Sequence, residues 1–336
     1  MTTTWLADGE KYALVGLEVK LEQGFPFREV VPGLWAWTDQ TLDLPAHWRE
    51  WLGSIRADRI KNCNLVLLSK FPSQTPEVLD AENRLLQQRV LGFYQGLLLA
   101  SASTPAHPPF MLTGSRYDGE IGVRQESAID IPSLNLFRYY QPVLPDEIIR
   151  AASIARAIED LGAAPPAGSA WRIFRALSVY TSGRTKGQLL DRLHQYRRCI
   201  DGLILSEPGS GLKQFKSRTE LFIGPRHHDL MGSLYAIRSD AEHLHEHKYL
   251  ENFDRDARLD LMQKEAIAEH IARHCLAHIL ETPALWQHFG NTATLGPFWK
   301  LAPADRQQLW GAPPINPADA LIGYDPKYIS NGDLGA

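Results

Sequence analysis

The feature that most constrains the fold is a change in hydrophobic pattern near residue 143. Strand-like and helix-like stretches mix before it, whereas helical patterns follow one another from there to residue 290 without strand-type alternation. Pro145, Asp146 and Glu147 are typical of a helix start, because proline needs no amide partner there and acids suit the positive helix end. With 336 residues the chain is long enough for two cores. We therefore expect an α+β protein with a mixed domain followed by a helical bundle.

Three stretches indicate the mixed domain. Leu17, Val19 and Leu21 alternate with charged residues, which is the period of a half-buried strand. The apolar run at 63–71 favours a covered strand, although its periodicity does not exclude a buried helix. The stretch 79–100 carries a helical apolar stripe, and a short strand pair is expected in the turn-rich segment after it. The predicted domains are 1–143, mixed; 144–290, helical; and 291–336, a Pro-rich extended C-terminal arm.

Cysteine usage and apolar patterning bear on the compartment. Cys63, Cys199 and Cys275 are scattered and include no CxxC pair, which argues against a disulfide framework and against a cysteine zinc site. The N-terminus lacks a basic region followed by an apolar core, and no apolar run approaches the length that spans a bilayer. These features predict a cytoplasmic protein without a membrane partner.

Charge is unevenly distributed along the chain. The formal net charge of −4 argues against a protein that coats nucleic acid by bulk charge. Between Trp171 and Leu230, however, the sequence contains eleven lysines and arginines but only five acidic residues, which is a local excess of six positive charges. An anionic partner is therefore expected to meet this local region.

The stretch LYAIRSDAEHLHEH at 234–247 contains an arginine and three histidines that are candidate catalytic residues. An arginine and a histidine together suffice to cleave RNA without a metal, because the imidazole moves a proton while the guanidinium holds the phosphate. On one regular helix, His243 lies roughly 140° round from Arg238, whereas His245 lies within about 20° of it. Across a dimer axis, the arginine of one chain and a histidine of the other could converge instead.

Other readings of the same residues stay open. The stretch could be a solvated helix face, or His243 and His247 could clamp a zinc ion from one face. His270, His274 and His278 form a second row at helical spacing that could bind a metal, with Cys275 beside rather than on it. Phosphate-loop, GxSxG, HExxH and Rossmann glycine patterns are absent from the sequence.

The helical region resembles the HEPN superfamily, and within it the Apea-like HEPN domains. The resemblance rests on RLHQYRRCIDGLIL at 192–205, FKSRTELFIG at 215–224 and LYAIRSDAEH at 234–243, in the family's order, and covers roughly residues 170–285. It implies a helical domain that dimerises and builds a composite ribonuclease site from two Rx4-6H motifs. Arg238 then matches the family's arginine, His243 its histidine and Ser239 its small polar residue. Leu244 stands where the family commonly has glycine, so His245 is kept as the alternative histidine.

The resemblance implies a metal-independent endoribonuclease without cofactors that acts as a homodimer in prokaryotic antiviral defence or a toxin system. Its substrate would be tRNA, mRNA or phage RNA. We expect Arg197, Arg198 and Arg218 to help hold the RNA, since they belong to the basic region. The alternative is a non-catalytic HEPN module that binds RNA or a partner protein. In either case the N-terminal domain would sense, dock or restrain, and a neutralising or sensing partner is plausible.

Overall fold

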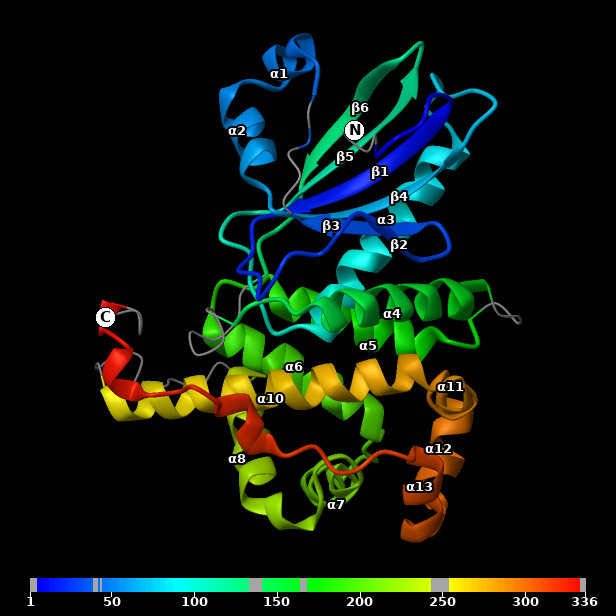
Figure 1. Cartoon of the computed structure of the whole chain (residues 1–336). Helices are drawn as coiled ribbons and strands as arrows, with labels where there is room; N and C mark the ends of the chain where they lie inside the picture. The colour runs from blue at the N-terminus through cyan, green and yellow to red at the C-terminus, as the bar shows by residue number, and fades with distance from the viewer. Residues whose placement is uncertain are drawn as a thin grey trace. The chain divides into compact units, whose positions relative to one another are not determined.

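The structure is a computed structural model that describes residues 5–38, 42, 44–132, 141–163, 168–242 and 254–332, with only the backbone described for 238–242. It divides into two compact units, one containing the described residues up to Glu159 and the other those from Asp160 onward. The first unit contains a sheet with helices, and the second is helical (Figure 1). The α+β fold class predicted from the sequence is confirmed.

The first unit is built on a six-stranded sheet in which every neighbouring pair is antiparallel, in the order β2-β3-β4-β1-β5-β6. Its strands are β1 (Glu10–Leu17), β2 (Arg28–Val31), β3 (Leu34–Thr38), β4 (Leu65–Pro72), β5 (Phe110–Tyr117) and β6 (Glu120–Ala128). Strand β4 and the hairpin β5–β6 confirm the strand predicted at 63–71 and the strand pair expected after residue 100. The alternating residues 18–21, by contrast, lie just beyond β1, where only Leu21 forms an isolated bridge, to Val143.

Helices cover the sheet of this unit (Figure 1). Helices α1 (Ala46–Leu52) and α2 (Ser54–Asn62) contribute Leu52 and Ile60 to an apolar cluster with Leu14, Leu68 and Leu112 of the central strands. Side chains alternate along a strand, so the buried residues between these point to the opposite face, and α3 (Ala81–Ala100) packs on β1 and β4. Central strands covered in this way need no polar face. That explains why β1 is an almost unbroken buried run instead of an alternating one.

Helix α4 (Pro145–Ala163) belongs to the first unit as far as Glu159, so the division of the chain falls about one helix later than the boundary expected at residue 143. The reason is close packing on α3. A Cβ atom at Gly96 would lie 2.2 Å from the carbonyl oxygen of Ala151, so only glycine lets the two backbones approach this closely. An ion pair of 2.8 Å between Arg89 and Glu159 joins the same two helices.

The second unit packs helices around α10 (Arg255–Glu281), a buried helix of 27 residues. Helices α5 (Trp171–Arg184) and α6 (Leu189–Ile204) pack against each other and against α10. Helix α7 (Gly211–Ile223) is followed by the 3-10 turn η2 (Pro225–His227) and by α8 (His228–Glu242), which packs on both α6 and α7. In the described part of the chain, no helix combines the length and apolar composition that crossing a bilayer requires.

The C-terminal segment differs from the extended arm expected over 291–336. After α11 (Pro283–Phe289) it forms α12 (Thr292–Lys300) and α13 (Pro303–Trp310), and then the 3-10 turns η3 (Pro317–Leu321) and η4 (Pro326–Tyr328). Its aromatic residues explain the difference. Phe298, Trp299 and Trp310 are buried and form ring contacts with Phe222 and Phe289, so the segment is part of the core of the second unit.

Candidate nucleic-acid interface

Helix α8 contains Arg238, the arginine of the predicted motif, in its helical backbone. The described helix extends to Glu242, the residue directly before His243. His243, His245 and His247 lie outside the described residues, as does the side chain of Arg238. The pairing of the arginine with either histidine therefore stays a prediction, and so does the zinc alternative on His243 and His247.

The turn before Arg238 is firmly held by Tyr235, which lies three residues earlier on α8. The guanidinium carbon of Arg197 lies 4.6 Å from the ring centroid of Tyr235 and 4.8 Å from that of Phe215. A glycine at the start of α7 makes room for this arrangement, since a Cβ atom at Gly211 would lie 2.5 Å from the tyrosine oxygen. Cation–π contacts of a desolvated guanidinium are among the strong ones. Arg197 thereby joins α6 to α7 and α8.

Two of the three arginines expected to hold RNA have structural partners. Arg197 is 1% exposed and its Nη1 lies 3.1 Å from Asp201. Arg218 donates from Nη1 to the carbonyl oxygens of Ile204, at 2.8 Å, and Leu205, so it caps the C-terminal end of α6. Burial lowers the pKa of Arg218. A role in RNA binding stays a prediction for both residues, but each guanidinium already stabilises the fold.

Arg198, the third of these arginines, is exposed and lines a groove of about 330 Å³ between α5 and α6. Trp171 lies at the start of α5 with 60% of its surface exposed, and Arg175, one turn later on the same helix, is also exposed. Within the described residues, neither Arg175 nor Arg198 forms an ion pair. Arg172 lies deeper in the groove, donates to the carbonyl oxygen of Gly202, and has its pKa lowered by burial.

This groove combines a flat aromatic surface with two cations, Arg175 and Arg198, that are exposed to solvent. Any nucleic-acid base can stack on an exposed indole ring, and nearby guanidiniums can contact the phosphates on either side of that base. Sequence reasoning counted the arginines but missed Trp171. The signal was present in WRIFR at 171–175, where Trp171 and Arg175 are spaced i,i+4 and so fall on one helix face.

A second group, of charged residues and one tyrosine, is buried and joins α5, α6 and α10. Glu269 accepts hydrogen bonds from the Tyr180 hydroxyl at 2.8 Å and from Arg273 Nε at 3.0 Å, and Arg184 Nη1 lies 3.6 Å from it. One turn earlier on α10, Glu265 accepts from Arg192 Nε at 3.1 Å. Both glutamates are 0% exposed. We call this set of six residues the buried ionic network. Its members are at most 9% exposed, so we assign the network a structural role.

The histidine row on α10 does not converge on a metal position. The rings of His270 and His274 lie 4.3 Å apart, and His270 is 5% exposed. His278 turns to Trp310 instead, with Nε2 2.6 Å from the tryptophan carbonyl oxygen and the rings 4.5 Å apart. Among the residues that the structure describes, no three His, Cys, Asp or Glu side chains are grouped so that they could hold a metal ion.

Comparison of the chain with models of protein families, with curated proteins and with solved structures found no match.

Proposed function

We propose that the chain is a metal-independent endoribonuclease of the HEPN type that acts as a homodimer. The sequence support is the Arg238 and His243 motif with two preceding helices in the family's order. The structural observation that carries the proposal is the exposed groove between α5 and α6, in which Trp171, Arg175 and Arg198 supply one stacking surface and two exposed cations. A single strand of RNA fits this chemistry because every base has a face that stacks and every phosphate carries charge.

The reaction is an internal transfer. The ribose 2′-oxygen attacks the adjacent phosphorus and the bond from phosphorus to the 5′-oxygen breaks, which leaves a 2′,3′-cyclic phosphate and a 5′-hydroxyl. A histidine, His243 or alternatively His245, removes the proton from the 2′-hydroxyl or delivers one to the leaving oxygen. The Arg238 guanidinium stabilises the negative charge that grows on the phosphate oxygens.

The biological setting is part of the proposal. We place the protein in the cytoplasm, in prokaryotic antiviral defence or a toxin system, with tRNA, mRNA or phage RNA as substrate. The N-terminal unit would sense a signal, dock or restrain the nuclease, and a neutralising partner would control it.

The test is cleavage of total cellular RNA by the full chain in EDTA. We expect the parent to cut, and the Arg238→Ala and His243→Ala variants to lose about a hundredfold or more of the activity, as removal of a charge-stabilising donor or of a general acid or base does. Arg226→Ala and His227→Ala on the turn before α8 are matched controls that should cut like the parent, since these residues lie outside the motif. If His243→Ala cuts like the parent and His245→Ala does not, the histidine is reassigned. Unchanged cleavage by Arg238→Ala contradicts the proposal.

The second candidate is a non-catalytic module that binds RNA, which the groove favours because it offers binding groups without reacting ones. Trp171→Ala should weaken binding of a single-stranded RNA by about five- to hundredfold, the range that loss of one stacking residue produces. Phe and Tyr at this position should restore most of the affinity. If the parent binds RNA through Trp171 yet never cuts it, and Arg238→Ala binds equally well, the second candidate replaces the first.

A further inference from the structure

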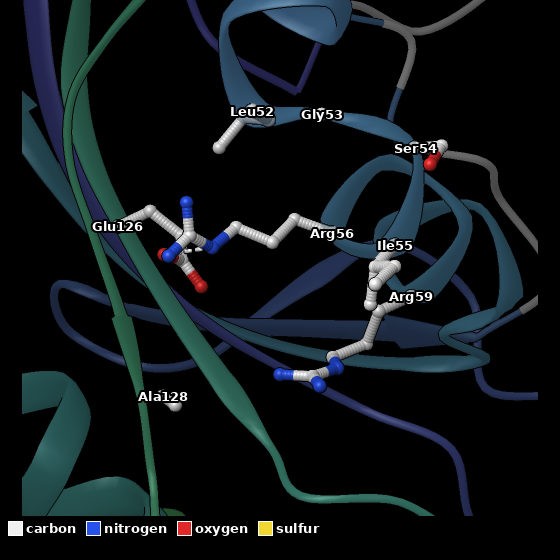
Figure 2. A pocket seen from close by; sticks show the side chains of 8 residues that line it. All are labelled: Leu52, Gly53, Ser54, Ile55, Arg56, Arg59, Glu126 and Ala128. Atoms are coloured by element: carbon white, nitrogen blue, oxygen red, sulfur yellow. Dashed lines mark ion pairs between the residues drawn. The ribbon is translucent and has the colours of Figure 1, made fainter.

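A second pocket lies wholly within the N-terminal unit, between the junction of α1 with α2 and the edge strand β6 (Figure 2). Its volume of about 680 Å³ is within the range of small-molecule sites, about 300 to 1,000 Å³. The lining consists of two arginines, one glutamate and a set of small or apolar residues: Leu52, Gly53, Ser54, Ile55, Arg56, Arg59, Glu126 and Ala128. None of these belongs to the proposed ribonuclease site.

Arg56 extends across the pocket to Glu126 of β6 (Figure 2). Its Nε lies 3.0 Å from the Glu126 carboxylate, whose side chain is only 8% exposed, while the arginine side chain is 57% exposed. The buried carboxylate therefore orients the guanidinium, while more than half of the arginine side chain stays exposed to solvent. A guanidinium held in this way is prepared to bind a second oxyanion, because less side-chain freedom remains to be lost.

Arg59 points into the same pocket from one turn further along α2 (Figure 2). In the described part of the chain it forms no ion pair, so its charge is available. The start of α2 adds positive potential, because the helix has neither a side-chain cap nor an acidic residue in its first turn. Gly53 makes that turn possible with a φ of 78°. The positive groups of the pocket, two guanidiniums and a helix N-terminus, thus outnumber its single carboxylate.

The remaining wall of the pocket is apolar. Leu52 and Ala128 line it, and Ile55 has 77% of its surface exposed. A ligand that pairs only with the arginines would leave this wall in water, whereas one with an apolar body would cover it. We propose that this pocket binds a phosphate monoester that carries an aromatic or apolar group. The phosphate contacts Arg56, Arg59 and the start of α2, and the apolar group packs on Ile55 and Leu52.

A phosphate monoester suits the charge better than a carboxylate. It carries about −1.5 to −2 at neutral pH and offers three acceptor oxygens, which matches two guanidinium forks and a helix start without a side-chain cap. The proposal is independent of the ribonuclease function and gives the N-terminal unit a ligand-binding role of its own.

The test is calorimetric titration of the full chain with phenyl phosphate, together with inorganic phosphate and phenol as partial ligands. We expect phenyl phosphate to saturate one site per chain, inorganic phosphate to bind the same site more weakly, and phenol to give no saturable heat. Competition between phenyl phosphate and inorganic phosphate should confirm that they share the site.

Variants locate the site. Arg56→Gln and Arg59→Gln should each weaken phenyl phosphate binding by about ten- to hundredfold, as loss of a charge-assisted hydrogen bond does. Arg49→Gln removes an equal charge from an exposed position on α1 outside the pocket, and its affinity should equal that of the parent. Glu126→Gln keeps an acceptor for Arg56 and removes the competing negative charge, so it should bind more tightly.

Absence of saturable binding to the folded parent would overturn the proposal, as would an equal loss in Arg49→Gln and Arg59→Gln. If Ile55→Ala binds phenyl phosphate as the parent does, the apolar half of the proposal is wrong. All the substituted arginines lie on exposed or half-exposed positions, so circular dichroism spectra should match that of the parent.

Discussion

The two units bury charge in different ways. In the sheet unit, Lys11 has a fully buried side chain, but both of its partners, Asp80 and Glu82 at the start of α3, keep 30% and 40% of their side-chain surface exposed. In the helical unit, Arg184 and Glu269 are both 0% exposed. The first pair lies where a strand end meets a helix start, whereas the second crosses the centre of a bundle. If the Lys11 ion pairs are broken, water can therefore solvate the carboxylates of Asp80 and Glu82. Water cannot reach Arg184 and Glu269 in the same way.

Burial also reduces the charge that the basic region presents at the surface. Of the eleven cations between Trp171 and Leu230, the structure buries Arg184, Arg192 and Arg197, so eight minus the five acids leaves a smaller surface excess of three. An RNA strand meets only the exposed charges. Three of those eight cations, Arg172, Arg175 and Arg198, line the groove between α5 and α6, where we propose that RNA binds.

The largest effect is expected from Glu269→Ala. This change leaves Arg184 and Arg273 buried without their carboxylate, which should lower the free energy of unfolding of the helical unit by about 3 to 5 kcal/mol. Glu281→Ala, on an exposed position of the same helix, is the control and should cost less than about 1 kcal/mol. Urea unfolding followed by far-UV circular dichroism measures both. Equal losses in the two variants would show that the buried ionic network contributes no more to the free energy of unfolding than an exposed charge does.

Adjacent arginines on α6 offer a sharper comparison. Arg197→Gln removes a buried guanidinium that contacts two aromatic rings and should cost about 2 kcal/mol of stability or more. Arg198→Gln should leave the melting temperature unchanged but weaken RNA binding and reduce the salt slope by about one. Thermal melts and salt-dependent binding titrations separate the two effects. If Arg198→Gln binds RNA as tightly as the parent, the groove is not the interface.

A smaller loss is expected for Lys11→Met in the sheet unit. Methionine keeps the apolar stem and removes two charge-assisted hydrogen bonds of 2.8 Å each, so we expect a loss of about 1.5 to 3 kcal/mol. Lys61→Met, on an exposed position of α2, should be nearly neutral. Urea unfolding curves of both variants test this. A loss as large as that of Glu269→Ala would remove the distinction between the two units.

The smallest effect concerns pH and has opposite signs in the two units. Burial raises the pKa of Glu265 above its ordinary 4.5, with Arg192 opposing. A raised folded-state pKa contributes stability that is complete below the unfolded value and lost as the pH rises through the folded one. Glu265→Gln does not titrate, so the parent should lose stability relative to this variant as the pH rises from about 4 towards neutrality.

Lys11 instead lowers the pKa of Asp80 and of Glu82 through hydrogen bonds. Their contribution is present above the unfolded pKa and is lost as the pH falls through the folded one. Acid titration of unfolding midpoints should therefore show that Lys11→Met loses less stability on acidification than the parent does. If the two proteins titrate in parallel, the Lys11 pairs do not contribute to stability.

Much of the fold could be predicted where a single hydrophobic pattern determines the type of secondary structure. Helix α3 carries a clear apolar stripe that includes Leu86, Val90 and Phe93, and β4 is an apolar run too short for a typical helix. The start of α4 could be predicted, but its packing with the first unit could not, because that packing depends on the contact between Gly96 and Ala151 across 55 positions of the chain. The tail was assigned as an arm because of its prolines, yet Pro303 is at the start of α13, where proline is favoured.

Less of the candidate site could be predicted. An arginine in a sequence is normally interpreted as a surface residue, and nothing local shows that Arg197 packs against rings contributed by α7 and α8. The buried ionic network could not be predicted for the same reason, because the spacing of Glu265 and Glu269 is that of a charged, solvent-exposed face of α10. Trp171 and Arg175 could have been found from their spacing alone.

The most direct test of the proposed chemistry is cleavage, by the full chain in EDTA, of two short RNAs that carry a mapped cutting site. The second RNA differs only by a 2′-deoxyribose on the 5′ side of the broken bond. We predict that the first is cut with a 2′,3′-cyclic phosphate end and that the second is bound but stays intact. Equal cutting of both RNAs would contradict attack by the 2′-hydroxyl, and with it the assignment of Arg238 and its histidine as a metal-independent ribonuclease pair.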